Sequence, residues 1–144
     1  MKTVEKKLLI NGENKKVHLR LTCGGQLKLK REFGEDTLST LMGAMSEVDK
    51  TVAVLDVSLN YKNNDNEITD GEELYDALVE NGVVGQEGFA KIITDIAVAS
   101  GIMKKDRANS ILKMVENTYE SMFDNIEKAL SEDTAEEKEE TPSK

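Results

Sequence analysis

The sequence predicts an α+β protein, with an N-terminal β-hairpin packed on a mostly helical bundle and a disordered acidic C-terminal tail. Three observations support this prediction. Two short segments with alternating apolar residues lie on either side of Asn11 and Gly12. Apolar residues then recur every three or four positions through most of the chain, as amphipathic helices require. The last residues, 131–144, are rich in Glu and have no large apolar side chain.

The hairpin is predicted from strands at residues 4–10 and 17–21. A two-residue loop at Asn11-Gly12 would pair Leu8 with Lys15, whereas a four-residue loop would pair Leu8 with Val17. The second register matches apolar residues with each other. We therefore expect the four-residue loop, despite the strong turn preference of Asn-Gly.

Helical segments are predicted from capping residues and from apolar spacing. Thr22 can cap a helix that runs to Phe33 and stops at Gly34, although Leu27 and Leu29 also allow a continued strand. A second helix starts near Asp36 and carries an apolar stripe. A third is expected over residues 51–61, with Asp49 and Thr51 as the break and cap, although its β-branched residues would also suit a strand.

Three further helices complete the body. Residues 69–72 have capping-box spacing, and the helix that they open should end at Gly82. Residues 85–100 form the next helix, with Gly101 as its stop. The longest pattern covers residues 104–130. We therefore expect one domain at residues 1–130 and a disordered tail at residues 131–144.

Composition narrows the classes of function. The chain has 144 residues, 28 acidic and 19 basic, with a net charge of −9. Such a balance repels nucleic acid and anionic lipid, and no stretch approaches the ~20 apolar residues of a membrane span. Basic residues cluster only locally, on what we interpret as solvated faces: Lys15, Lys16, His18, Arg20, Lys28, Lys30 and Arg31. We expect neither nucleic acid nor a membrane as a partner.

Catalytic motifs are missing from the sequence. His18 is the single histidine and Cys23 the single cysteine, so no disulfide forms within the chain and no zinc ligand cluster is indicated. We expect Cys23 to be buried. The glycines do not form a phosphate-binding loop. The N-terminus is charged and has no apolar leader pattern, which favours the cytoplasm. We expect a protein that is not an enzyme and has no cofactor.

One segment has the spacing of a calcium-binding loop. Aligned to that loop, Asn63 and Asp65 fall at the third and fifth positions and Glu72 at the twelfth, and Glu67 completes the candidate set. Two residues depart from the pattern. Tyr61 stands where an Asp begins the coordination, and Asn66 replaces the turn glycine. We favour an ordinary polar loop before a helix cap over a metal site.

The order of elements resembles a known family. The strand "LLING", the strand "KVHLRLT" and the helical run "LKREFGED", followed by further helices, are similar to phage tail assembly chaperones of long-tailed phages and of prophages in Gram-positive bacteria. The similarity covers residues 4 to 103. It implies a protein of the host cytoplasm that binds the tape-measure protein and keeps it soluble during tail assembly. It also implies a frameshifted longer form, and self-association is an additional possibility.

Candidate partner-binding residues come from the longest apolar stripe, which exceeds what a small globule can cover. They are Ile111, Val115, Met122 and Ile126. The alternative is that this helix closes the bundle. Two other functions stay open: a structural completion or connector protein retained in the virion, and a degenerate calcium-binding helical module.

Overall fold

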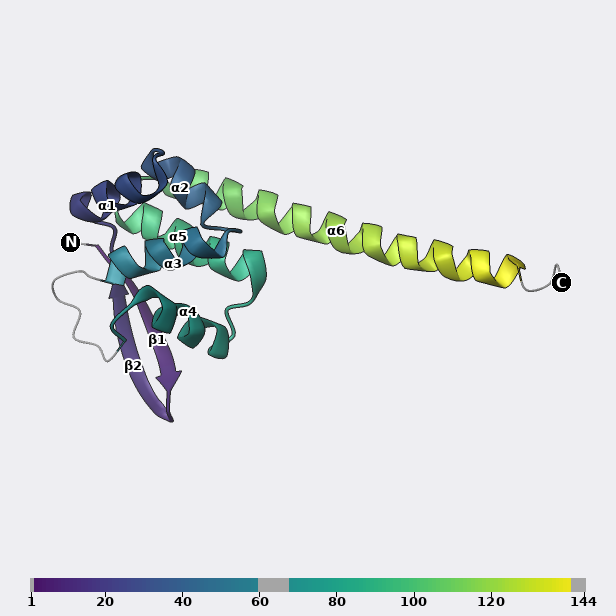
Figure 1. Ribbon diagram of the computed structural model, residues 1–144, viewed down its shortest axis with the longest axis horizontal. Helices are drawn as coiled ribbons and strands as arrows, with labels where there is room; N and C mark the ends of the chain where they lie inside the picture. Colours follow the sequence, from purple (N-terminus) through teal and green to yellow (C-terminus); the bar gives the residue numbers. More distant parts are fainter. Residues whose placement is uncertain (1, 60–67, 141–144) are drawn as a thin grey trace.

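The computed structural model describes residues 2–59 and 68–140, with side chains as far as Ser131. Within these residues it contains a two-stranded antiparallel sheet and six helices, which confirms the α+β class with a mostly helical body (Figure 1). In chain order the elements are β1 Val4–Ile10, β2 Glu13–Leu19, α1 Cys23–Phe33, α2 Thr37–Gly43, α3 Val48–Leu59, α4 Gly71–Glu80, α5 Gly85–Ala99 and α6 Lys105–Glu140.

The hairpin has the two-residue loop, so the predicted register is wrong. Leu8 pairs with Lys15, and Asn11 and Gly12 both have positive φ, at 52° and 80°. The two registers differ by two residues and therefore place the same side chains inward, so the apolar pattern could not distinguish them. Turn geometry decides instead, because positive φ at both loop residues matches the twist of the strands.

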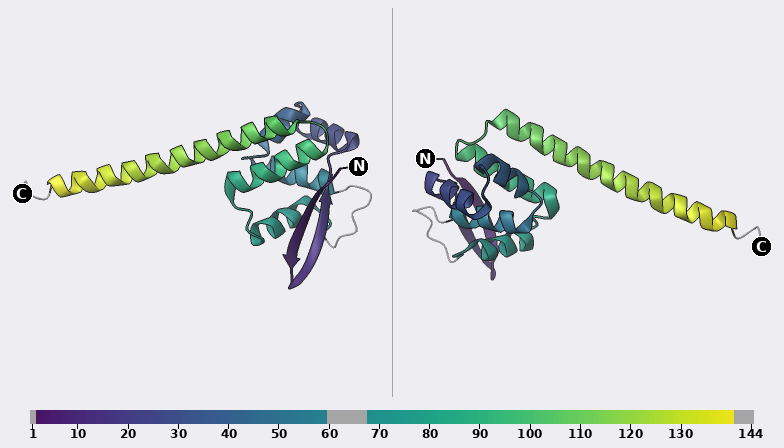
Figure 2. Two further views of the ribbon diagram at one scale, coloured as in Figure 1. Left: turned by 180° about the vertical axis from the view of Figure 1, so that it is seen from behind. Right: turned by 45° about the horizontal axis from the view of Figure 1, so that its top comes forward.

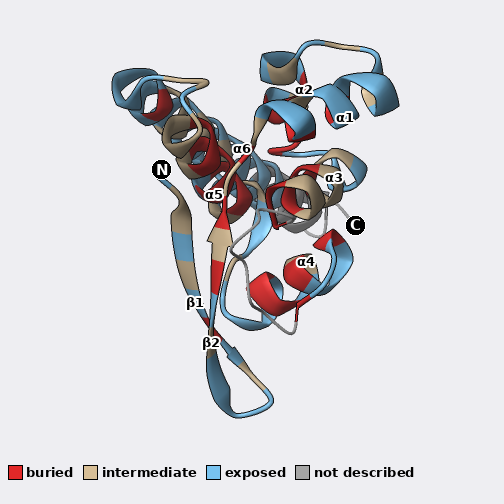
Figure 3. Cartoon of the chain, turned by 90° about the vertical axis from the view of Figure 1, so that its left-hand side faces the viewer, coloured by how far each residue is buried: buried red, intermediate tan, exposed pale blue. Residues whose placement is uncertain are grey.

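The hairpin packs on the helices by one face and extends beyond them at its tip (Figure 3). Leu8, Val17 and Leu19 are buried. Where β2 ends, the guanidinium of Arg20 donates to the carbonyl oxygens of Lys2 and Ala99, at 2.6 and 2.9 Å. This side chain therefore joins the N-terminal segment to the end of α5, and it serves the fold rather than a solvated face.

Helix α1 follows the sequence prediction. The Thr22 hydroxyl accepts a hydrogen bond from the Gly25 amide at 3.1 Å, and Gly34 ends the helix with φ 69°. The strand alternative is excluded. Cys23, however, is exposed rather than buried. The cap places Cys23 on the outer side of the first turn, while Gly25 and Leu29 face the core.

The break between α2 and α3 lies earlier than predicted. Asp36 caps α2 as expected, but α2 ends at Gly43 and α3 begins at Val48. Thr51 therefore lies inside α3, where its hydroxyl donates to the carbonyl of Ala44 across the turn. The side chains of Glu47 and Lys50 lie over Gly43, since a Cβ there would be 2.7 Å from Glu47 Oε2 and 2.8 Å from Lys50 Cδ.

Lys50 holds this corner together. Its ammonium lies 2.7 Å from Glu35 Oε1 and 3.1 Å from Glu47 Oε2, and 5.8 Å from the centre of the Phe33 ring. Hydrogen bonding to Glu35 first, and then to Glu47, raises the pKa of Lys50 above its ordinary value. The cation thus links the end of α1 to the start of α3.

The ends of α4 and α5 agree with the sequence prediction to within a residue. The N-cap of α4 is Asp70, which accepts from the Glu73 amide at 2.9 Å, so the cap lies one residue after the predicted Thr69. Gly82 and Gly101 follow the ends of α4 and α5 with φ of 92° and 76°. Positive φ at these positions favours glycine.

The core lies between the hairpin and helices α1 to α5. Helix α3 contacts both the helices beside it and β2. The largest fully buried side chains are Leu and Ile residues with two valines: Leu19, Leu21, Leu29, Leu41, Leu55, Leu74, Leu78, Ile92, Ile93, Ile96, Val17 and Val54. A mostly aliphatic core agrees with the low aromatic content of the chain, 4% with no Trp.

Helix α6 begins on the body and then leaves it. Figures 1 and 2 show it lying along α5 and continuing as a single rod far beyond the other elements. Its 36 residues correspond to a length of about 54 Å. Its backbone is helical to Glu140, so it includes residues 131–140 of the predicted tail. Disorder of that segment in solution stays a prediction.

Candidate functional site

The apolar stripe of α6 divides into a covered and an uncovered part. We define the proximal face as Ala108, Ile111, Leu112, Val115 and Tyr119, which are buried or half-buried. We define the distal face as Met122, Phe123, Ile126 and Leu130, whose side chains are 54%, 54%, 53% and 62% exposed. The sequence pattern is the same in both parts. Only the distal face lacks a covering element among the described residues.

The boundary between the two faces is set by where α5 begins. Helix α5 lies along the proximal face, and its first residue, Gly85, lies beside the Tyr119 hydroxyl, since a Cβ on Gly85 would be 3.1 Å from that oxygen. The Phe123 ring leans on the Tyr119 ring, with centroids 5.2 Å apart. Beyond Tyr119, every residue from Glu120 to Ser131 is exposed, and no other element among the described residues covers the helix.

The four predicted partner-binding residues therefore separate into two pairs. Ile111 and Val115 pack against the core, as the alternative of a bundle-closing helix implies. Met122 and Ile126 lie on the distal face and are free of that packing. Phe123 and Leu130 share this face and were absent from the predicted set. Their spacing of three or four residues from Ile126 was the available signal.

Four large apolar side chains in three turns of one helix form a continuous exposed surface. Single exposed apolar residues are ordinary on proteins, but a contiguous patch indicates an interaction site. Burying one such side chain fully would contribute about 1.5–3 kcal/mol. The distal face can therefore bind another apolar surface without any change in the body of the protein.

The candidate calcium site falls mostly outside the described residues. Asn63, Asp65 and Glu67 lie there, while Glu72 is in the first turn of α4. Glu72 lines a cavity of about 360 Å³, and four other acidic residues also line it: Glu32, Asp49, Asp56 and Asp70. Asp56 accepts from the Gly71 amide at 2.9 Å. In the described ranges no group of three or more potential ligands is arranged to hold a metal ion.

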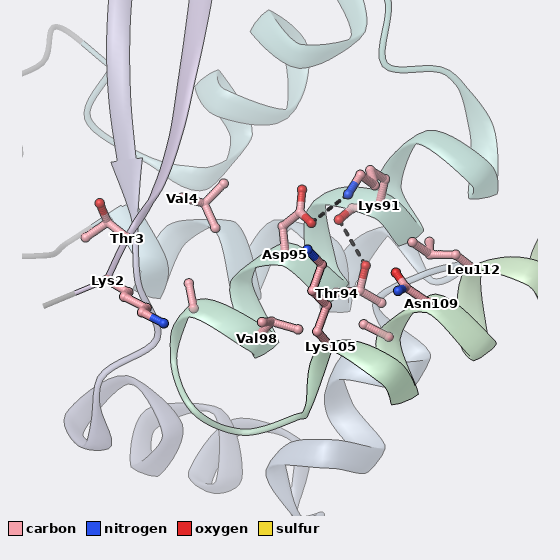
Figure 4. A pocket seen from close by; sticks show the side chains of 12 residues that line it. Lys2, Thr3, Val4, Lys91, Thr94, Asp95, Val98, Lys105, Asn109 and Leu112 are labelled. Carbon is pink, nitrogen blue, oxygen red and sulfur yellow. Dashed lines mark hydrogen bonds and ion pairs between the residues drawn. The ribbon is translucent and has the colours of Figure 1, made fainter.

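A second cavity, of about 430 Å³, lies between the N-terminal segment, α5 and α6 (Figure 4). Lys2, Lys91, Asp95 and Lys105 contribute its charged groups. The Asp95 carboxylate is 2.9 Å from Lys91 Nζ and 3.9 Å from Lys6 Nζ. The carboxylate at its wall is thus engaged with cations of the fold itself, and we assign this cavity no ligand.

Comparisons with known proteins do not place the chain in a family. No family model matches the chain, and the comparisons with curated proteins and with solved structures gave no significant match. Over residues 2–59 and 68–140, no helix has both the length and the apolar character needed to cross a membrane. A proposal about function therefore has to start from the structure itself, and we base it on the exposed apolar residues of the distal face.

Proposed function

We propose that this chain is a non-enzymatic phage tail assembly chaperone, which binds the tape-measure protein and keeps it soluble in the host cytoplasm. The observation that carries the proposal is the distal face of α6, an uncovered apolar surface held away from the body. The family resemblance of the N-terminal hairpin and first helices agrees with it.

The chemistry of the distal face suits a long helical client. Met122 has a flexible, polarisable side chain that adapts to partners of varied shape. Phe123, Ile126 and Leu130 supply apolar area at one-turn spacing, the arrangement used when helices pack along each other. The net charge of −9 would keep a complex with an apolar client in solution.

Co-expression with a candidate tape-measure protein tests the proposal. Gene neighbourhood supplies the candidate, since a long gene downstream of the one for this chain is where a tape-measure protein is to be sought. We expect the client to be soluble with the wild-type chain and to precipitate with the variant Met122→Ser/Ile126→Ser. The matched control is Leu27→Ser/Val84→Ser, which removes two exposed apolar side chains from the body instead. This control should still keep the client soluble.

Other outcomes would contradict the proposal. A client that is equally soluble without the chain, or with the Met122→Ser/Ile126→Ser variant, needs no chaperone surface on α6. Detection of the chain in purified virions by mass spectrometry would favour a structural tail component. Self-association and a frameshifted longer form stay predictions, to be checked by sedimentation and by mass spectrometry of infected cells.

A further inference from the structure

We propose that the distal face takes a single amphipathic helix whose apolar stripe is bordered by Lys or Arg residues. This inference deepens the proposed function and rests on it for the biological source of that helix. Two observations carry it: the way α5 covers the proximal face, and the distribution of charge beside the distal face.

Helix α5 is the element that covers the apolar stripe of α6 on its proximal face. It lies lengthwise on the proximal face and places Ala90, Ile93 and Ala97 in the core behind it. At Gly85 this cover stops, beside Tyr119, while the apolar stripe continues in the same line. A partner helix laid on the distal face would continue the line of α5 and extend an interface that already exists within the chain.

The two borders of the distal face differ in charge. With 3.6 residues per turn, Glu120 and Glu127 lie along one border of the distal face, and Asp124 lies just behind them. Glu116 continues the same border beside the proximal face. All four are exposed. The other border carries the uncharged Thr118, Ser121 and Asn125. Between residues 114 and 131 the only basic residue is Lys128.

This acidic border selects the partner. A helix packed on the distal face would place its own border residues within a few ångströms of Glu120 and Glu127. Acidic residues there would be repelled, and Lys or Arg would form ion pairs across the interface. Such rim charges mainly decide which partner is accepted and how fast it associates.

A second copy of the chain fits less well. Two α6 helices packed antiparallel would bring their acidic borders together, which is unfavourable. Packed parallel, each acidic border would meet the uncharged border of the other copy, so no ion pairs would form apart from those of Lys128. The observations therefore favour a basic partner helix over self-pairing.

Two synthetic peptides of about three heptads test the proposal. Both carry the same leucine stripe, and one has Lys at its borders where the other has Glu. Binding to the full-length chain is measured by fluorescence anisotropy of a labelled peptide. We expect the Lys-bordered peptide to bind about tenfold tighter than the Glu-bordered one, through several rim ion pairs. This preference should shrink as salt is raised above about 0.15 M.

Variants locate the binding. Glu120→Gln/Glu127→Gln should remove most of the preference for the Lys-bordered peptide. The control Glu80→Gln/Glu87→Gln changes net charge equally at exposed positions on the body and should leave the preference intact. Met122→Ser/Ile126→Ser should abolish binding of both peptides. Circular dichroism checks that each variant keeps the helical content of the wild-type chain, because unfolding of the distal part of α6 would also abolish binding.

Three results would overturn the inference: equal binding of the two peptides, binding that survives Met122→Ser/Ile126→Ser, or a dimer in sedimentation that this variant converts to monomer. The last result would assign the face to a second copy. The co-expression assay separates the two proposals. A chain that binds the Lys-bordered peptide but leaves the tape-measure protein insoluble supports this inference and contradicts the proposed function.

Discussion

The side-chain amide of Asn81 binds both backbone polar groups of Leu9. Asn81 Oδ1 accepts from the Leu9 amide at 2.8 Å, and Asn81 Nδ2 donates to the Leu9 carbonyl at 3.2 Å and to the Ala77 carbonyl at 2.7 Å. Residues 72 positions apart in the chain are joined in this way. The C-terminal end of α4 thus occupies part of the open edge of β1, where a third strand would otherwise pair.

Replacing Asn81 with Ala should loosen the hairpin. The change removes three hydrogen bonds at a partly exposed site, and we expect a loss of about 1–2 kcal/mol in the free energy of unfolding. Urea denaturation measures the loss, and amide exchange at Leu9 should become faster. The control is Asn14→Ala, at the exposed position that pairs with Leu9 on β2. Equal losses for the two variants would contradict a specific role for Asn81.

Gly71 should not tolerate a side chain. A Cβ there would lie 2.3 Å from the Val52 carbonyl oxygen and 2.8 Å from Asp56 Cβ, so α4 would have to move away from α3. We expect Gly71→Ala to cost about 1–3 kcal/mol by overpacking. In Gly24→Ala, by contrast, the new methyl meets its nearest neighbour at 3.8 Å, and stability should stay level or rise slightly. Thermal unfolding of the pair distinguishes close packing from helix propensity.

The hydroxyl of Ser58 is buried and has no hydrogen-bond partner among the described residues. Ser58→Ala should therefore stabilise the protein by about 1 kcal/mol, because an unsatisfied polar atom leaves the core. Thr51→Val is the contrasting change, since it deletes a buried hydroxyl that donates to the Ala44 carbonyl, and it should destabilise. Chemical denaturation of both variants checks the difference in sign.

Asp36 should give stability a dependence on acid pH. Hydrogen bonds from the Ser39 amide and hydroxyl, at 2.8 and 3.0 Å, lower the pKa of Asp36 below its ordinary value of 3.8. The charged cap therefore contributes stability that is fully present above the unfolded-state value and is lost as pH falls through the lower folded-state value. Melting temperatures from neutral to acid pH should fall less steeply for Asp36→Asn. Identical pH profiles would show that the cap is not the titrating group.

The acidic segment after Leu130 should contribute nothing to the stability of the body. A chain ending at Leu130 is expected to unfold at the same temperature as the full chain, because residues 131–144 are rich in Glu and have no large apolar side chain to add to the core. Limited proteolysis should cut residues 131–144 first. A clear fall in melting temperature after truncation would show that this segment belongs to the folded domain.

How far the sequence predicts this fold depends on the kind of signal. Helix ends were predictable where one residue type meets a strict backbone requirement, as at Thr22, Gly34 and Gly101. The hairpin register was mispredicted because the matching of apolar pairs was given more weight than the Asn11-Gly12 turn signal, although both registers bury the same face. The end of α2 was missed because the apolar spacing runs on through Met45, past Gly43 where the helix ends.

The candidate site was predictable only in part. The spacing of apolar residues predicts one uninterrupted stripe on α6. That spacing does not say which turns of the helix contact the rest of the protein. That division depends on where α5 starts against α6, a tertiary relation visible at Gly85 and Tyr119. Ile111 and Met122 are therefore alike in the sequence pattern but differ in the structure.

The shape of α6 affects how closely copies of this protein could bind along one long fibre. A lone helix is only about 10–12 Å wide, whereas the globular end is several helices across. If many copies bind to one long fibre through the distal face of α6, their globular bodies collide before neighbouring α6 helices do. The diameter of the globular body then sets how many copies saturate the fibre. The stretches of fibre between adjacent α6 helices stay open to solvent.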